Sequence, residues 1–362
     1  MKLSDVAVGR DNNFNLIRFA AAFSVLVSHG YAIVLGPEAF EPLERMLGYT
    51  LGEIAVDVFF ISSGFLVCGS LLRLEHLRRF ARARAFRIFP ALAVALAITT
   101  LLMGPLASTL SVYEYFRDPQ WILYLTRNIL LFGGVEHHLP SVFTDLPQSG
   151  VVNGSLWTLP FEVWCYAALA ITWAALRKSR LGFDRLPALL VAAAIGSFVL
   201  FHATRVYGME IHHGFRLFFM FFSGASFFAL KDHVPFDWRF AAAITIAVIA
   251  SAQDPASFVL VYPLCAAYLV LCAAYLPGQL VRNFNRLGDY SYGIYIYAFP
   301  VQQLVILLSP PHWSLGALVG AAAAITFLAA FVSWHVVEKP FLARVVAPEI
   351  LTHPVVQTPA AP

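Results

Sequence analysis

Residues 52–72 read GEIAVDVFFISSGFLVCGSLL, an apolar run whose charged side chains are Glu53 and Asp57. A helix needs about 20 mostly apolar residues to cross a bilayer, where each backbone polar group must be bonded within its own segment. The run therefore predicts a transmembrane helix. The same pattern recurs along the chain, and we expect ten helices, at about 14–35, 52–72, 88–106, 154–176, 186–203, 214–230, 239–253, 257–276, 288–308 and 314–336.

Composition favours an all-α, polytopic membrane bundle of about ten helices. Hydrophobic residues make up 59% of the 362 residues and charged residues 12%, too few charges for a soluble surface. The aromatic stretch 113–133 would add an eleventh, re-entrant or interfacial helix. No change of composition divides residues 1–348, so we expect one membrane domain, followed by a disordered tail over 349–362 that is rich in Pro and Ala.

Basic residues predict the orientation, because connections rich in Lys and Arg stay in the cytoplasm. With a cytoplasmic N-terminus, the inner connections hold most of the 24 Lys and Arg residues, including the run from Arg73 to Arg87. The even helix count then puts both termini in the cytoplasm. The net charge is only +3, and no patch indicates nucleic acid. No metal is expected, because the cysteines lack metal-type spacing; they are Cys68, Cys165, Cys265 and Cys272.

An ionisable side chain inside an expected helix costs a few kcal/mol and is a candidate for function, and His29, Asp57 and Glu162 are the candidates for the chemistry. The helical rise puts His29 roughly 16 Å deeper than Arg18, Asp57 about 8 Å from the outer end of its helix, and Glu162 about 12 Å from the outer end of its own. This similar depth predicts one cavity in which a carboxylate orients His29 as a general base. The alternative is that each residue only hydrogen-bonds between helices.

A second group of charges lies at the expected cytoplasmic surface. Arg84 and Arg87 are three residues apart, which places them on one helix face. Paired guanidinium groups suit bidentate phosphate binding, and Arg18 lies at the same level. The alternative is plain cytoplasmic charge or attraction to anionic lipid.

Six blocks together resemble the acyltransferase 3 family, bacterial membrane O-acyltransferases that modify cell-surface and exported polysaccharides. Arg18 and His29 fit its signature of an arginine, ten residues and a histidine. The family often has a histidine near Tyr295, where this chain reads YIYA, so no role is carried over to that position. The other blocks are VDVFFISSGFL (56–66), RAFRIFP (84–90), NGSLWTLPFE (153–162), GDYSYGIYIYAFP (288–300) and WHVVEKP (334–340).

The resemblance implies transfer of an acyl group, usually acetyl, from cytoplasmic acyl-CoA (acetyl-CoA) to a hydroxyl of an extracytoplasmic carbohydrate. The acceptor would be an exopolysaccharide, a lipopolysaccharide or a lipid-linked glycan, and the enzyme would lie in the bacterial inner membrane. His29 would deprotonate the hydroxyl, oriented by Glu162 or Asp57. The residues implied for the donor are Arg18, Arg84, Arg87, Ser63, Gly64 and Tyr292.

Three alternatives stay open at this stage. Gly64 fits close helix packing as well as passage of the donor arm. A transporter or flippase for a glycolipid or small anion would also put charges at mid-depth, although we find no repeated halves. A haem or quinone protein would need histidines on facing helices, and His29 is the one histidine well inside an expected helix.

Overall fold

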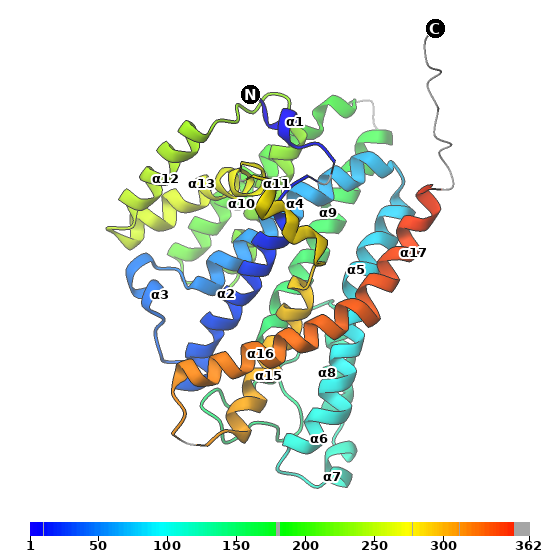
Figure 1. Cartoon of the computed structure of the whole chain (residues 1–362), viewed down its shortest axis with the longest axis vertical. Coiled ribbons are helices and arrows are strands. Elements are labelled where there is room, and N and C mark those ends of the chain that lie inside the picture. Colours follow the sequence, from blue (N-terminus) through cyan, green and yellow to red (C-terminus); the bar gives the residue numbers. More distant parts are fainter. Residues whose placement is uncertain (10, 179–181, 277, 311, 351–362) are drawn as a thin grey trace.

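The computed structural model describes residues 1–9, 11–178, 182–276, 278–310 and 312–350. These residues form a helical bundle (Figure 1), and no strand occurs among them. A helix is present at each of the ten expected places. They are α2 (Phe14–Leu35), α4 (Leu51–Leu74), α5 (Leu77–Ile98), α9 (Leu159–Lys178), α10 (Leu186–Val206), α11 (His212–Ala229), α12 (Trp238–Ser251), α13 (Pro255–Tyr275), α15 (Ser291–Leu308) and α16 (Leu315–Ser333).

Within the described ranges, eight helical segments are long and apolar enough to cross a membrane. The prediction of an all-α, multi-pass membrane protein is thereby confirmed. The two expected helices outside that set are α11, with 18 residues, and α12, with 14. The number of crossings, the side of the termini and the single domain over 1–348 stay predictions. In the expected tail, α17 (Lys339–Ile350) covers the first residues, and 351–362 lie outside the described residues.

The largest difference from expectation is the start of the third long helix. It begins at Leu77, not near residue 88, and continues through a π-helical turn (Thr99–Met103) into α6 (Gly104–Ala107). Arginine is a good helix former, and the basic stretch buries Phe80 and Ala83 on its apolar face. Hydropathy alone therefore placed the start too late. The 31 residues measure about 46 Å, longer than the roughly 30 Å hydrocarbon core.

Several short elements complete the chain. The aromatic stretch expected to form one extra helix contains two, α7 (Val112–Arg117) and α8 (Gln120–Leu130). Figure 1 shows α6 and α7 at the end of the bundle opposite α1 (Leu3–Val6). A further short helix, α3 (Pro42–Leu47), connects α2 to α4, and a 3-10 turn, η2 (Gly154–Thr158), leads into α9. A second π-helical turn, η5 (Trp334–Glu338), joins α16 to α17.

Helix α4 is the centre of the bundle. Of the residues in its most apolar stretch, 72% are buried, against 22% for the segment that contains α10. It packs most extensively on α11 and α2, while α15 packs on α2 and α16. Glycines allow the contact between α4 and α11. A methyl group added at Gly64 would collide with the Phe221 carbonyl, and one at Gly224 with the Ile61 carbonyl. The two backbones therefore touch directly, as small residues permit in membrane helix pairs.

Candidate active site

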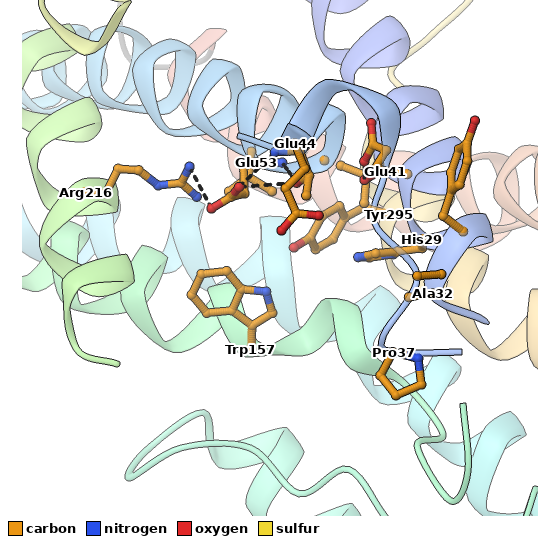
Figure 2. A pocket seen from close by; sticks show the side chains of 16 residues that line it. His29, Ala32, Pro37, Glu41, Glu44, Glu53, Trp157, Arg216 and Tyr295 are labelled. Carbon is orange, nitrogen blue, oxygen red and sulfur yellow. Dashed lines mark hydrogen bonds and ion pairs between the residues drawn. The ribbon is translucent and has the colours of Figure 1, made fainter. Parts of the chain in front are cut away.

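A cavity of about 220 Å³ opens beside His29, and we name it the His29 cavity. Its wall comes from α2, α3, the start of α4, η2, α11 and α15. Figure 2 shows the imidazole of His29 pointing into it, toward Tyr295 and Trp157. The polar and aromatic residues of the wall are Ser28, His29, Tyr31, Glu41, Glu44, Thr50, Glu53, Trp157, Arg216 and Tyr295.

His29 is held by packing and is left without a polar partner. Its ring lies 5.3 Å from the ring of Phe299 in an edge-to-face contact. Its Nδ1 atom is buried and has no hydrogen-bond partner in the described part of the chain. A neutral imidazole that faces a cavity in this way can take a proton from a bound hydroxyl group.

A buried arginine forms the α11 side of the same cavity. Arg216 is 1% exposed; its Nη1 lies 3.2 Å from Glu53 Oε1 and its Nε lies 3.6 Å from Asp57 Oδ1. The guanidinium also covers the ring of Tyr49, with the centroid 5.2 Å away. Glu53 is positioned by the capping box that begins α4, in which Thr50 Oγ1 accepts from its backbone N–H at 3.0 Å. One turn of α4 thus supplies both carboxylates of this ion pair.

A smaller second cavity, of about 40 Å³, lies next to the first, and we name it the middle cavity. The two cavities share Val56 and Tyr295 as wall residues. Tyr295 is held at this wall by Thr158, whose Oγ1 is 2.6 Å from its hydroxyl, and by the Ser155 carbonyl at 2.8 Å. The middle cavity also contacts Arg18, Phe59, Glu162 and Tyr292. The two cavities thus have a common wall at Val56 and Tyr295, and the second one reaches Arg18.

Glu162 belongs to a hydrogen-bonded group beside the middle cavity. Ser63 Oγ donates to Glu162 Oε1 at 3.3 Å and lies 3.0 Å from the Tyr166 hydroxyl, which itself donates to Glu162. The guanidinium of Arg84 lies over the ring of Tyr166, 5.9 Å from its centroid. In the described residues Arg84 has no carboxylate ion pair, and its buried Nε has no hydrogen bond. Two of the expected donor residues, Ser63 and Arg84, are thus brought together through Tyr166.

Arg18 and Arg87 meet two carboxylates in what we name the Arg87 cluster, which consists of Arg18, Arg87, Asp289 and Glu338. Arg87 Nη2 donates to Asp289 Oδ2 at 2.7 Å, and its Nη1 lies 3.5 Å from Glu338 Oε2. Arg18 Nη1 lies 3.7 Å from the same Asp289 oxygen. The guanidinium of Arg87 also covers the ring of Tyr292, whose hydroxyl donates to the Ile88 carbonyl at 2.9 Å. The cluster ties α2, α5, the start of α15 and η5 together.

Asp289 precedes α15, and its surroundings favour the charged form of its carboxyl group. Burial alone would raise the pKa of its carboxyl, but the charges of Arg87 and Arg18 and the hydrogen bonds from Ser291 lower the pKa from 3.8 to about 2. The carboxylate therefore stays charged at any physiological pH.

The structure does not form the expected contact between His29 and a carboxylate. Among the described residues, no Asp or Glu lies within ion-pair or hydrogen-bond distance of the imidazole, because Asp57 faces Arg216 and Glu162 faces Tyr166. The helical rise predicts depth, but each residue also turns by about 100°, and depth does not reveal which face a side chain occupies. His29 and Glu162 are thus linked only through adjoining cavities.

Gly64 lies away from both cavities, since its position against α11 leaves no space for a ligand. Helix packing, the alternative drawn from the sequence, accounts for this glycine. In the same way, the paired state of Arg87 distinguishes it from Arg84, although the sequence gives both the same expected role.

Several site residues were missed from the sequence. Arg216 carried a usable signal, because an arginine inside an apolar run needs a buried partner, and Glu53 and Asp57 were available on α4. Asp289 and Glu338 stand inside quoted sequence blocks, but nothing local paired them with Arg87. Glu41 and Glu44 lie in and beside a short helix that hydropathy does not detect. In the described ranges, no group of three His, Cys, Asp or Glu side chains is placed to hold a metal ion.

Comparison with known proteins gives the family. The acyltransferase 3 family, an acyltransferase domain, matches residues 11–335. An O-acetyl transferase of Shigella phage Sf6 is 30% identical over 347 residues, covering 92% of this chain and 97% of that protein. Nodulation protein 10 of Rhizobium leguminosarum bv. viciae is 32% identical over 361 residues, covering 92% and 93%. No solved structure gives a significant match. With its membrane bundle, the Arg18 and His29 pair and a match over most of its length, the chain belongs to the acyltransferase 3 family of acyltransferases.

Proposed function

We propose that this acyltransferase moves an acyl group, most simply acetyl, from cytoplasmic acyl-CoA to a hydroxyl of a carbohydrate on the other side of a bacterial inner membrane. The acceptor would be an exopolysaccharide, a lipopolysaccharide or a lipid-linked glycan. The observation that carries the proposal is the unpartnered His29 imidazole in a cavity that adjoins a second cavity beside Arg18. The relative from phage Sf6, named an O-acetyl transferase, supports the acetyl donor.

In this proposal the Arg87 cluster faces the cytoplasm and the His29 cavity faces the opposite side. Arg84 and Arg18 bind phosphates of the coenzyme, because each has a buried Nε without a hydrogen-bond partner in the described residues. Arg87 shapes the same surface, although two carboxylates already hold it. The pantetheine arm follows Ser63, Glu162 and Tyr292 toward Tyr295.

The chemistry proposed at His29 is direct transfer. The sugar hydroxyl oxygen attacks the thioester carbonyl carbon while the imidazole accepts the hydroxyl proton. The carbon–sulfur bond then breaks, and the imidazolium returns the proton to the leaving thiolate, so the coenzyme departs as a thiol. Asp57 acts at one remove, by holding Arg216 in the cavity wall.

The experiment combines mass spectrometry of the surface polysaccharide, with and without the gene, and acetyl transfer by the purified protein. We expect His29→Ala to lower transfer by about 10²–10⁴-fold, the usual contribution of a general base, while the protein accumulates normally. His312→Ala is the matched control, since His312 is exposed in the connection between α15 and α16. Acetylation that persists in the His29 variant would refute this role of the residue, and a polysaccharide unchanged by loss of the gene would refute the function.

A further inference from the structure

The wall of the His29 cavity is acidic. Glu41, Glu44 and Glu53 all come from the short stretch that contains α3 and begins α4. The guanidinium in the wall is Arg216, which Glu53 and Asp57 already share. A ligand therefore meets more carboxylate than cationic charge.

These three carboxylates differ in how much of their bonding capacity is used. Glu41 accepts from Ser28 Oγ at 2.5 Å and from the Leu51 backbone N–H at 2.9 Å. Glu53 is engaged by Thr50 and Arg216. Glu44 has no side-chain hydrogen bond or ion pair in the described part of the chain, and Figure 2 shows its carboxylate pointing into the cavity beside Glu53 and Tyr295. Glu44 is therefore the charge that a bound molecule would contact.

Other nearby charges do not reverse this balance. His213 Nδ1 lies 3.6 Å from the same Glu53 oxygen that faces Arg216, and Arg205 lies over the ring of Tyr49 outside the cavity wall. The positively charged side chain in the cavity wall is Arg216 itself. It is 1% exposed, and none of its three guanidinium nitrogens makes a hydrogen bond with a described residue. Arg216 can thus donate to a neutral oxygen of a ligand while its charge stays with Glu53 and Asp57.

The shape and remaining wall suit one sugar ring. A volume of about 220 Å³ is large enough to hold one sugar ring. The indole of Trp157 stands opposite Glu44 and Glu53 across the cavity (Figure 2), offering an apolar surface to the C–H face of a ring. Hydroxyl groups on the ring edge can donate to Glu44, forming strong hydrogen bonds to a charged acceptor.

We infer that the His29 cavity selects a neutral or amino sugar as the acceptor unit and rejects a sugar that carries a carboxylate or phosphate. This inference rests on the proposed function for the position of the acceptor. A uronate near Glu44 adds a like charge inside a partly enclosed site, where such a juxtaposition strongly penalises the wrong partner. An ammonium group at the same place gains an ion pair.

The test measures binding separately from transfer. The purified full chain is placed in nanodiscs, and saturation-transfer NMR compares three probes with one ring: methyl glucoside, methyl glucuronide and methyl glucosaminide. We expect the glucuronide to bind at least about fivefold more weakly than the glucoside, as one unfavourable charge contact predicts, and the glucosaminide at least as well as the glucoside. Glu44→Gln should reduce the difference in affinity between the glucuronide and the glucoside to within about twofold. Glu38→Gln, an exposed neighbour outside the cavity wall, should leave it unchanged.

Each failure has a distinct signature. Equal binding of glucuronide and glucoside, an unchanged preference in Glu44→Gln, or no binding of any probe would each overturn the charge selection. None of these results affects the proposed function if polysaccharide acetylation still depends on His29. Loss of that dependence, with the binding preference intact, would instead leave a sugar site without the proposed chemistry.

Discussion

Two arginines in this molecule, Arg216 fully buried and Arg87 largely so, each lie between two carboxylates, with different results. In the Arg87 cluster the contacts are as short as 2.7 Å, and they join residues of α2, α5 and η5 with Asp289, which precedes α15. In the wall of the His29 cavity, Arg216 lies 3.2 and 3.6 Å from Glu53 and Asp57, both on α4. A buried pair stabilises only when its geometry compensates for desolvation. The Arg87 cluster therefore holds its helices together and stabilises the fold, whereas Arg216 remains able to interact with a ligand.

The largest effect is expected from Arg87→Ala. It would leave the buried Glu338 without its ion-pair partner and Asp289 with only the longer contact to Arg18, and loss of one member of a buried ion pair costs about 3–5 kcal/mol. The free energy of unfolding in detergent, and the amount of protein in the membrane, measure this cost. Arg82→Ala is the matched control, because Arg82 is exposed on the same helix. Equal stability of the two variants would show that the Arg87 cluster does not stabilise the fold.

Arg216→Ala should destabilise the protein less, by about 2 kcal/mol, because its contacts are longer and Glu53 keeps its hydrogen bonds to Thr50. It should nevertheless abolish acetyl transfer, since Glu53 in the cavity wall and the buried Asp57 would both lose their counter-charge. Thermal stability and transfer are measured on the same preparation, with Arg216→Lys as the conservative variant. A larger loss of stability than in Arg87→Ala would reverse the comparison.

Acid should weaken the Arg87 cluster in a defined pH window. The pKa of Asp289 is lowered from 3.8 to about 2, so its contribution, about 2 kcal/mol, is fully present above pH 4 and is lost as the pH falls toward 2. Asp289→Asn should remove this dependence and lower stability at neutral pH. The free energy of unfolding in detergent is measured from pH 7 to pH 2 for the native protein and for the variant. An identical dependence on pH in the two proteins would contradict the prediction.

The smallest effect is expected from Arg84→Gln. Arg84 has no carboxylate pair among the described residues, so its loss should cost little stability. It should raise the KM for acyl-CoA about tenfold, the loss expected for one charge-assisted hydrogen bond, with little change in kcat. Arg82→Gln is the control on the same helix. A stability loss similar to that of Arg87→Ala, with an unchanged KM, would place Arg84 in the structural group.

Apolar run length predicted the long helices well, because the bilayer requirement acts on each segment by itself. α2 begins and ends where it was expected, at Phe14 and Leu35. The prediction failed where charge and helix coincide, at the Leu77 start of α5, and where a helix has few residues, as in α3. The π-helical turn at Thr99–Met103 has no periodic signal in the sequence.

The candidate site was predicted only in part. His29, Arg18 and Glu162 all lie beside one of the two adjoining cavities, as their positions inside apolar helices indicated. Their partners could not be inferred, because a partner depends on which helices are neighbours and how each is rotated. Asp57 shows this most clearly: its depth suggested His29, while the contact between α4 and α11 gives it Arg216.

The close contact of α4 with α11 at Gly64 and Gly224 has a mechanical consequence. With no side chain between the two backbones, α4 and α11 cannot slide or rotate past each other without collision, so they move as one rigid unit. Glu53 and Asp57 lie on α4, and Arg216 lies on α11. The spacing of these charges is therefore fixed by the pair of helices, and motion that admits a sugar would come from α2, α3, η2 and α15, which form the remaining walls.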